Sequence, residues 1–152
     1  GIGILKQQAT LKVWAAINPY NHIELTDFNV YFVEPLKINT ELTERLHEKA
    51  YLNAYTYYKT GKYKSAIVAF KNALKQYPES KRREEIMYLI VKSGSKLADN
   101  SVQDKQADRY LSTLDSYYSF VAEFPESHYL KELDRLAQNA KDFLDRNNKE
   151  KQ

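Results

Sequence analysis

The sequence contains no cysteine, and this absence removes several kinds of chemistry at once. Disulfide bonds, thiolate zinc sites and a cysteine nucleophile are all excluded. The cellular compartment stays open, because exported proteins can also lack cysteine. Only four glycines and four prolines occur among the 152 residues, and 28% of the residues are charged. This composition favours long helices over a turn-rich β architecture.

Long apolar runs are also missing. No stretch approaches the roughly 18 to 20 consecutive apolar residues that a membrane span needs, and the first residues lack the basic and apolar regions of a signal peptide. If the protein is exported, we expect this sequence to begin after its signal. The formal net charge is only +3. Nucleic-acid binders usually concentrate more positive charge on one face, so we expect no nucleic-acid partner.

The first 38 residues differ in character from the rest of the chain. Residues 9–17 and 22–38 are rich in β-branched and aromatic side chains with partial alternation, which is typical of strands. The stretch NPYN between them supplies turn chemistry. We therefore expect residues 1–38 to form a short extended or β segment, such as a hairpin, ahead of the main domain.

From Asn39 onward the apolar residues take up helical spacing, which predicts a mainly α domain over residues 39–147. Five principal helices are expected: one to about residue 60, one over 63–77, and three that start after Ser80, Ser101 and Ser127. Residues 148–152 form a polar tail, and the stretch DRNNKEKQ that includes them should fray because it has no apolar face.

Several residues predict how these helices begin and end. Gly61 suits the left-handed position after a helix, and Ser80 and Ser127 can cap the helices that follow them. Ser101 with Asp104 three residues later resembles a capping box. In the third helix, Gly94 allows a close approach of a neighbouring backbone.

Part of the sequence repeats itself. The stretch YKSAIVAFKNALKQYPES from Tyr63 is matched 47 residues later, where Tyr110 stands for Tyr63 and Pro-Glu-Ser returns at 125–127. Repeated antiparallel helix pairs build a solenoid, with small residues where two helices approach closely and aromatic residues beside them. Eight positions fit the roughly 34-residue tetratricopeptide pattern. They are Ala54, Tyr57, Gly61, Tyr63, Ala66, Phe70, Ala73 and Pro78.

The fit has departures in both units. Ala50 and Asn53 stand where the pattern has tryptophan and leucine. In the second unit the period is 47 residues, and Thr113 and Phe120 replace the two alanines. We expect the extra residues, around 97–108, to lengthen the helices or their connection, and residues 130–144 to form a C-terminal capping helix.

These residues resemble a known family. A tyrosine-rich helix leading into YYKTGKYKSAIVAFKNALKQYPES, then REEIMYLIVKSGSKLADNS and YYSFVAEFPES, is similar to the C-terminal repeats of BamD. BamD is the outer-membrane lipoprotein of the β-barrel assembly machine, and the likeness is to its Bacteroidetes-type form, over about residues 39–144. The resemblance implies a non-enzymatic scaffold at the periplasmic face of the outer membrane. It also implies protein partners, namely BamA and other subunits of that machine.

Members of this family are anchored through a lipid on an N-terminal cysteine and carry further repeats ahead of these. This sequence has no cysteine, and its residues 1–38 do not match such repeats. We therefore expect a truncated or divergent member, or one with a replaced N-terminal half, whose membrane anchor is not in this chain. Two other functions stay open: another periplasmic tetratricopeptide adaptor, such as one serving cell-envelope division, and a regulatory helical module of a larger enzyme.

Tyrosines on the first helix are candidates for partner binding. Tyr51, Tyr55 and Tyr58 share one stripe, while Tyr57 points away from its centre toward the core. Tyrosine suits interfaces because it combines a large contact area with a polar tip. The resemblance adds that this face of the first helix lines the concave groove of the repeats.

Basic residues give a second set of candidates. On the second helix Val68 lies on the face opposite the core stripe, and the basic residues nearby on that helix and in the following turn form one cluster. They are Lys71, Lys75, Lys81, Arg82 and Arg83. This cluster is either a solvated helix end or a surface for an acidic partner.

Catalytic and metal-binding patterns are not evident. His22, His47 and His128 lie far apart, and only acidic residues common on any helix face stand near them. No nucleophile, base and orienting group occur together in a recognisable spacing. We therefore predict no enzymatic activity, no cofactor and no metal site.

Overall fold

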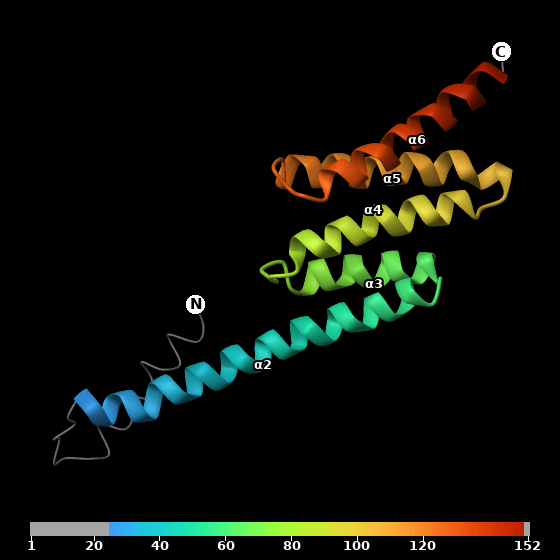
Figure 1. Cartoon of the computed structure of the whole chain (residues 1–152). Helices are drawn as coiled ribbons and strands as arrows, with labels where there is room; N and C mark the ends of the chain where they lie inside the picture. Colours follow the sequence, from blue (N-terminus) through green and yellow to red (C-terminus); the bar gives the residue numbers. More distant parts are fainter. Residues whose placement is uncertain (1–24, 151–152) are drawn as a thin grey trace. The chain divides into compact units, whose positions relative to one another are not determined.

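The computed structural model describes residues 25–150, and the regular structure in this range is helical (Figure 1). The helices are α2 (Leu25–Lys59), α3 (Tyr63–Gln76), α4 (Arg83–Asp99), α5 (Gln103–Glu123) and α6 (Leu130–Glu150). No strand occurs among the described residues, so the prediction of a mainly α protein with five helices is confirmed. The chain divides into two compact units, residues 1–44 and 45–152, and α2 has residues in both.

The first unit differs from expectation where the structure describes it. Residues 25–38, expected to be extended, belong to α2. β-branched residues favour a strand mainly when a neighbouring strand packs against them. The sequence of α2 contains no glycine that would end a helix, so the helix continues through these residues. Pro35 does not interrupt α2. The other half of the expected hairpin, residues 9–17, lies outside the described residues.

The second unit contains the helical repeat. Consecutive helices α3, α4, α5 and α6 run in alternating directions (Figure 1), with α4 in contact with both α3 and α5. α6 packs on α5 and, less extensively, on α4. Gly61 joins α2 to α3 with φ of 77°, the left-handed conformation that glycine adopts without strain. This confirms the predicted helix end.

The repeated Pro-Glu-Ser sequence forms the same turn twice. The Ser80 hydroxyl accepts a hydrogen bond from the Arg82 N–H at 3.2 Å, and the Ser127 hydroxyl accepts one from the Tyr129 N–H at 3.2 Å. In both cases the helix begins three residues after the serine. The serines therefore order the turn before the helix instead of occupying the N-cap position itself.

The predicted capping box at Ser101 is wrong. α5 begins at Gln103, its N-cap position is Val102, and no side chain caps it. The Ser101 hydroxyl instead donates to the Leu97 carbonyl at the end of α4 and accepts a hydrogen bond from Arg109. A serine hydroxyl between two helices can cap the helix that follows or hydrogen-bond to a carbonyl of the helix that precedes it. Here the hydrogen bond from Arg109 favours the second arrangement.

The core of the first repeat follows the sequence pattern. Ala66, Phe70 and Ala73 of α3 are buried, as is Ala54 of α2. The rings of Tyr51 and Phe70 lie 6.3 Å apart and connect the two helices. Small residues are thus buried between the helices and an aromatic residue packs beside them, as the tetratricopeptide pattern predicts.

In the second repeat a glycine on the facing helix α4 accommodates the larger Thr113 of α5. Thr113 and Phe120 of α5 are only 2% and 0% exposed. A Cβ atom on Gly94 of α4 would lie 2.7 Å from the Thr113 Oγ1 atom, so any other residue here would force the two helices or the Thr113 side chain to shift. This confirms the predicted close approach at Gly94. The extra residues lengthen α5 to 21 residues, against 14 in α3.

The last helix closes the stack. Leu133, Ala137 and Ala140 are the buried residues of α6, which packs on α5 where the rings of Tyr110 and Phe143 lie 4.7 Å apart. This agrees with the predicted capping helix. α6 continues to Glu150, however, so residues 145–150 are helical where a frayed end was expected. Residues 151 and 152 lie outside the described residues.

Candidate protein-binding surfaces

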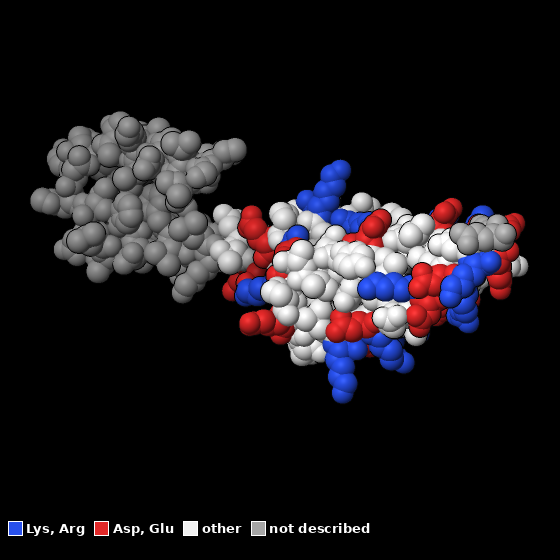
Figure 2. Space-filling view, turned by 90° about the horizontal axis from the view of Figure 1, so that it is seen from above, with Lys and Arg blue, Asp and Glu red and all other residues white. Residues whose placement is uncertain are grey.

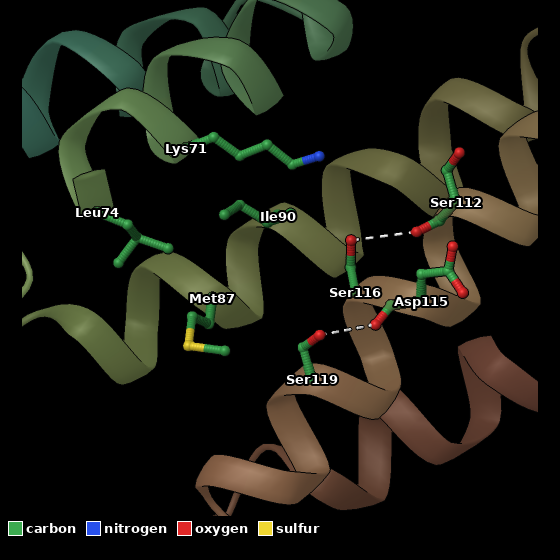
Figure 3. A pocket seen from close by; sticks show the side chains of 8 residues that line it. All are labelled: Lys71, Leu74, Met87, Ile90, Ser112, Asp115, Ser116 and Ser119. Carbon is green, nitrogen blue, oxygen red and sulfur yellow. Dashed lines mark hydrogen bonds between the residues drawn. The ribbon is translucent and has the colours of Figure 1, made fainter.

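A groove lies between α3 and α5, with α4 as its floor (Figure 3). It consists of two adjoining hollows of about 350 and 210 Å³. We call it the α3–α5 groove. Four residues line both hollows: Lys71, Ile90, Ser112 and Ser116. Because Lys71 comes from α3 and the serines come from α5, both hollows span the same two walls.

The floor and the α5 wall of this groove differ in chemistry. Met87 and Ile90 of α4 form an apolar floor, and Leu74 of α3 adds a further apolar side chain beside it. The wall on α5 carries small hydroxyl residues (Figure 3). The Ser116 hydroxyl donates to the Ser112 carbonyl at 3.1 Å, and a similar bond of 3.0 Å joins the Ser119 hydroxyl to α5. These hydroxyls have used their protons, so they offer acceptor lone pairs to the groove.

The α3 wall contains residues that the sequence had indicated. Val68 is 55% exposed and Lys71 is also exposed, and both line the α3–α5 groove. Figure 3 shows the Lys71 ammonium extending from α3 toward α5. Lys75, one turn further on α3, is exposed but does not line either hollow. The α5 wall and the α4 floor were missed, although serines recur on α5 at helical spacing beside its core residues.

A third hollow, of about 630 Å³, lies between α2 and α3. Ala50 and Asn53 are among its lining residues, and they replace the tryptophan and leucine of the tetratricopeptide pattern. The smaller side chains leave this space open. Val68 lies on the rim of this hollow as well as in the α3–α5 groove, and its exposed methyl groups are therefore available from both sides of α3.

The predicted tyrosine stripe exists as a ladder of rings. The ring centroids of Tyr51 and Tyr55 are 5.6 Å apart, and those of Tyr55 and Tyr58 are 5.9 Å apart. Tyr63 continues the ladder at 5.9 Å from Tyr58. Tyr55 and Tyr58 are half-buried against the core, and so is Tyr57. The ladder thus exposes only part of each ring.

Tyr51 does not face an open groove, contrary to expectation, because it is only 4% exposed. Its hydroxyl donates a hydrogen bond to the Glu85 carboxylate at 2.7 Å, and the Arg82 guanidinium lies 4.1 Å from the ring centre. Burial is the main cause that raises the pKa of Tyr51, and the hydrogen bond to Glu85 adds to it. Helical spacing placed Tyr51 on the stripe correctly, but α4 covers that end of the stripe.

The same arrangement recurs one helix pair further along. The Tyr88 hydroxyl donates to the Glu132 carboxylate at 2.6 Å, and the ring of Tyr129 stacks on Tyr88 at 4.0 Å. Glu132 and Tyr129 stand 47 residues after Glu85 and Arg82. A tyrosine on one helix is thus covered by a flat group and hydrogen-bonded to a glutamate two helices later. These contacts hold α2 to α4 and α4 to α6.

The basic turn after α3 is largely neutralised within the chain. Arg82 makes two hydrogen bonds to Glu48, at 2.7 and 2.8 Å, and a third to Glu85 at 2.8 Å. Arg83 pairs with Glu123 of α5. Both guanidinium groups therefore join helices, which the sequence could not indicate because the glutamates lie 34 and 40 residues away. Lys81 is exposed.

The described histidines contact aromatic rings. His47 lies 4.5 Å from the Tyr77 ring and His128 lies 3.9 Å from the Tyr129 ring. Within residues 25–150 no group of three or more histidine, cysteine, aspartate or glutamate side chains is placed to hold a metal ion. His22 lies outside the described residues.

Charges of both signs are mixed on the face that Figure 2 shows, where lysine, arginine, aspartate and glutamate surround an uncharged area. Mixed charge of this kind fits a surface that binds proteins better than one that binds a phosphate backbone.

No helix in the described part of the chain has the length and hydrophobicity to cross a membrane.

Antiparallel helix pairs, a turn used twice and a tyrosine contact used twice define a tetratricopeptide-like helical repeat protein. The chain belongs to the YfiO family of outer membrane lipoproteins, whose family model matches residues 41–150. The match supports the resemblance to BamD-like proteins, and it implies the periplasmic side of the outer membrane. No curated protein matches the sequence.

Proposed function

We propose that this protein is a scaffold of the outer-membrane β-barrel assembly machinery and that it binds BamA through the outer face of α3. The observation that carries the proposal is the division of α3 into two faces. Ala66 and Phe70 are fully buried, whereas Val68 and Lys71 are exposed on the opposite side. The family membership of the chain supports the outer-membrane setting.

The outer face of α3 suits a partner that is acidic and partly apolar. Val68 offers apolar area that a partner can cover, and Lys71 and Lys75 can pair with carboxylates. The half-buried rings of Tyr55 and Tyr58 form a second candidate contact on α2. Because α3 is held on its other side by buried residues, it presents these groups without rearrangement, which lowers the entropic cost of binding.

The direct test is isothermal titration calorimetry, in which the purified chain is titrated with the purified periplasmic part of BamA from the same bacterium. We expect saturable heat and a one-to-one complex that weakens as salt rises, since the lysines contribute electrostatic attraction. The absence of any binding up to high micromolar concentration would exclude BamA as the partner and would favour another periplasmic adaptor role.

A further inference from the structure

We infer that the α3–α5 groove binds an acidic segment of a partner protein, whose apolar side chains insert between α3 and α5. The inference rests on the proposed scaffold function and deepens it. The groove shares Val68 and Lys71 with the outer face of α3, whereas neither the sequence pattern nor the family match assigns its α4 floor and α5 wall. Its elements are the apolar floor, the serine wall and the lysine-bearing rim already described.

The floor of the groove accepts apolar side chains. Leu74 is half-buried, and it stands beside Met87 and Ile90 from α4 (Figure 3). Toward the start of α3 the lining continues with Ile67 and Val68. Covering such side chains removes apolar area from water, which is the main favourable contribution to protein association. Two adjoining hollows of about 350 and 210 Å³ provide room for more than one inserted side chain.

The α5 wall permits close approach of another chain. Ser112, Ser116 and Ser119 follow one another at spacings of four and three residues, so they face the same side of α5. Their short side chains leave the groove open along this wall. Since the protons of Ser116 and Ser119 are already donated to α5 carbonyls, the oxygens can accept hydrogen bonds from N–H groups of the incoming segment.

Charge defines the kind of segment that fits. Lys64 and Lys71 line the α3 side, and both are exposed. On the α5 side Arg109 lines one hollow and hydrogen-bonds to Ser101, while Asp115 lines the other. Positive charge therefore gathers on the α3 rim, and the α5 rim is mixed. An occupant with carboxylates toward α3 would complement this arrangement.

The repeat itself does not require lysines at these positions. Leu111 and Tyr118 stand 47 residues after Lys64 and Lys71 in the equivalent helix α5, and they are similarly exposed. The same structural positions thus accept uncharged residues in the second repeat. The basic rim of α3 is consequently a feature of this groove and not a consequence of helix packing.

The test uses two labelled 14-residue peptides and fluorescence polarisation with the full chain. In the first peptide leucine recurs every third or fourth position and glutamate fills the other positions; in the second each glutamate is replaced by lysine. We expect the acidic peptide to bind at least tenfold more tightly than the basic one. The double variant Lys64→Glu, Lys71→Glu should reverse this preference.

Ser112→Trp supplies the steric test, because Ser112 is exposed and lines both hollows. We expect it to weaken binding of the acidic peptide at least tenfold with an unchanged melting temperature. Leu111→Trp is the matched control, since Leu111 is the preceding residue, is exposed, and does not line the groove. It should bind the acidic peptide as the unaltered chain does.

Three results would overturn the inference: equal binding of both peptides, full binding of the acidic peptide by folded Ser112→Trp, or a concentration-dependent dimer that Ser112→Trp dissociates. The third would mean that a second copy fills the groove. Binding of BamA by the unaltered chain is scored separately. If the unaltered chain does not bind BamA, the proposed function is refuted. The results with the peptides decide only whether the groove binds an acidic segment.

Discussion

At the scale of single residues, the contact of α4 with Thr113 of α5 depends on Gly94. Thr113 takes the position that Ala66 occupies in the first repeat, and its hydroxyl is held by a 2.8 Å hydrogen bond to the Arg109 carbonyl. The bulk added on α5 is offset by the missing side chain on α4. The larger Thr113 and the smaller Gly94 thus fit together, and α4 and α5 stay in contact.

This exchange gives a prediction about Gly94→Ala. In the unaltered chain we expect a loss of about 1–3 kcal/mol, because the new methyl group would overlap the Thr113 hydroxyl. In a Thr113→Ala background the same change should stabilise the protein by about 0.5–1 kcal/mol, since alanine favours helix over glycine and the overlap is gone. Urea unfolding of the four chains measures both values. Equal effects of Gly94→Ala in the two backgrounds would contradict the contact.

Glu132 gives a prediction about pH. The hydrogen bond from Tyr88 is the main cause that lowers the pKa of Glu132, and Lys92 adds to it. A carboxylate whose pKa is lower in the folded state contributes stability above its unfolded pKa, about 4.3, and loses it as pH falls through the folded pKa. The free energy of unfolding should therefore fall below about pH 5.

Glu132→Gln cannot titrate, so its free energy of unfolding should depend less on pH between about 5 and 3 than that of the unaltered chain. Chemical denaturation at several pH values measures the two slopes. Glu150→Gln, an exposed change at the end of α6, is the control and should keep the original slope. Identical slopes for Glu132→Gln and the unaltered chain would show that the Tyr88–Glu132 contact is not maintained in solution.

At the scale of helices, α3 separates folding from binding. Its buried face determines whether the repeat forms, and its exposed face is available to a partner. Ala66→Arg should cost on the order of 3 kcal/mol or more, because it places an unpaired charge in a fully buried helix contact. Asn72→Arg, on the exposed side of α3, should be nearly neutral. Thermal melts of both variants test this, and similar melting temperatures would contradict the assigned core face.

Local sequence patterns predicted the helices from α3 onward well. Gly61 ends a helix, Ala66 and Phe70 face the core, and both Pro-Glu-Ser turns recur in the structure. Each of these features depends on residues close in the chain, so helical spacing and turn chemistry are sufficient to indicate them. The helical state of residues 25–38 was not predicted, because β-branched and aromatic composition indicates a strand only where a neighbouring strand packs against it.

The candidate surfaces were only partly predictable, because they depend on contacts between residues that are far apart in the sequence. Tyr51 is buried by contacts with Arg82 and Glu85, which are 31 and 34 residues away in sequence. The serine wall meets the lysine rim only because α4 brings α3 and α5 together. Spacing within one helix assigns a residue to a face, but it does not indicate which other helix covers that face.

At the scale of the whole molecule, the residues from 45 onward form a stack whose helices are connected by buried aromatic rings and by ion pairs between helices. Many of its tyrosines and arginines serve these connections, which leaves a smaller set of exposed groups for partners. Among the candidates from the sequence, Val68, Lys71, Lys75 and Lys81 stay exposed, and the first three lie on α3. We therefore propose that α3 presents a preformed docking face for BamA.

The measurement that tests this claim most directly is calorimetric binding of BamA by the double variant Val68→Glu, Lys71→Glu, with a thermal melt of the same sample. We predict a loss on the order of 2 kcal/mol or more, about thirtyfold in Kd, with a nearly unchanged melting temperature. Lys131→Glu with Asn139→Glu makes the same change in net charge on exposed positions of α6 and should keep full affinity. Full affinity of the folded α3 variant, or equal losses in both variants, would contradict the account.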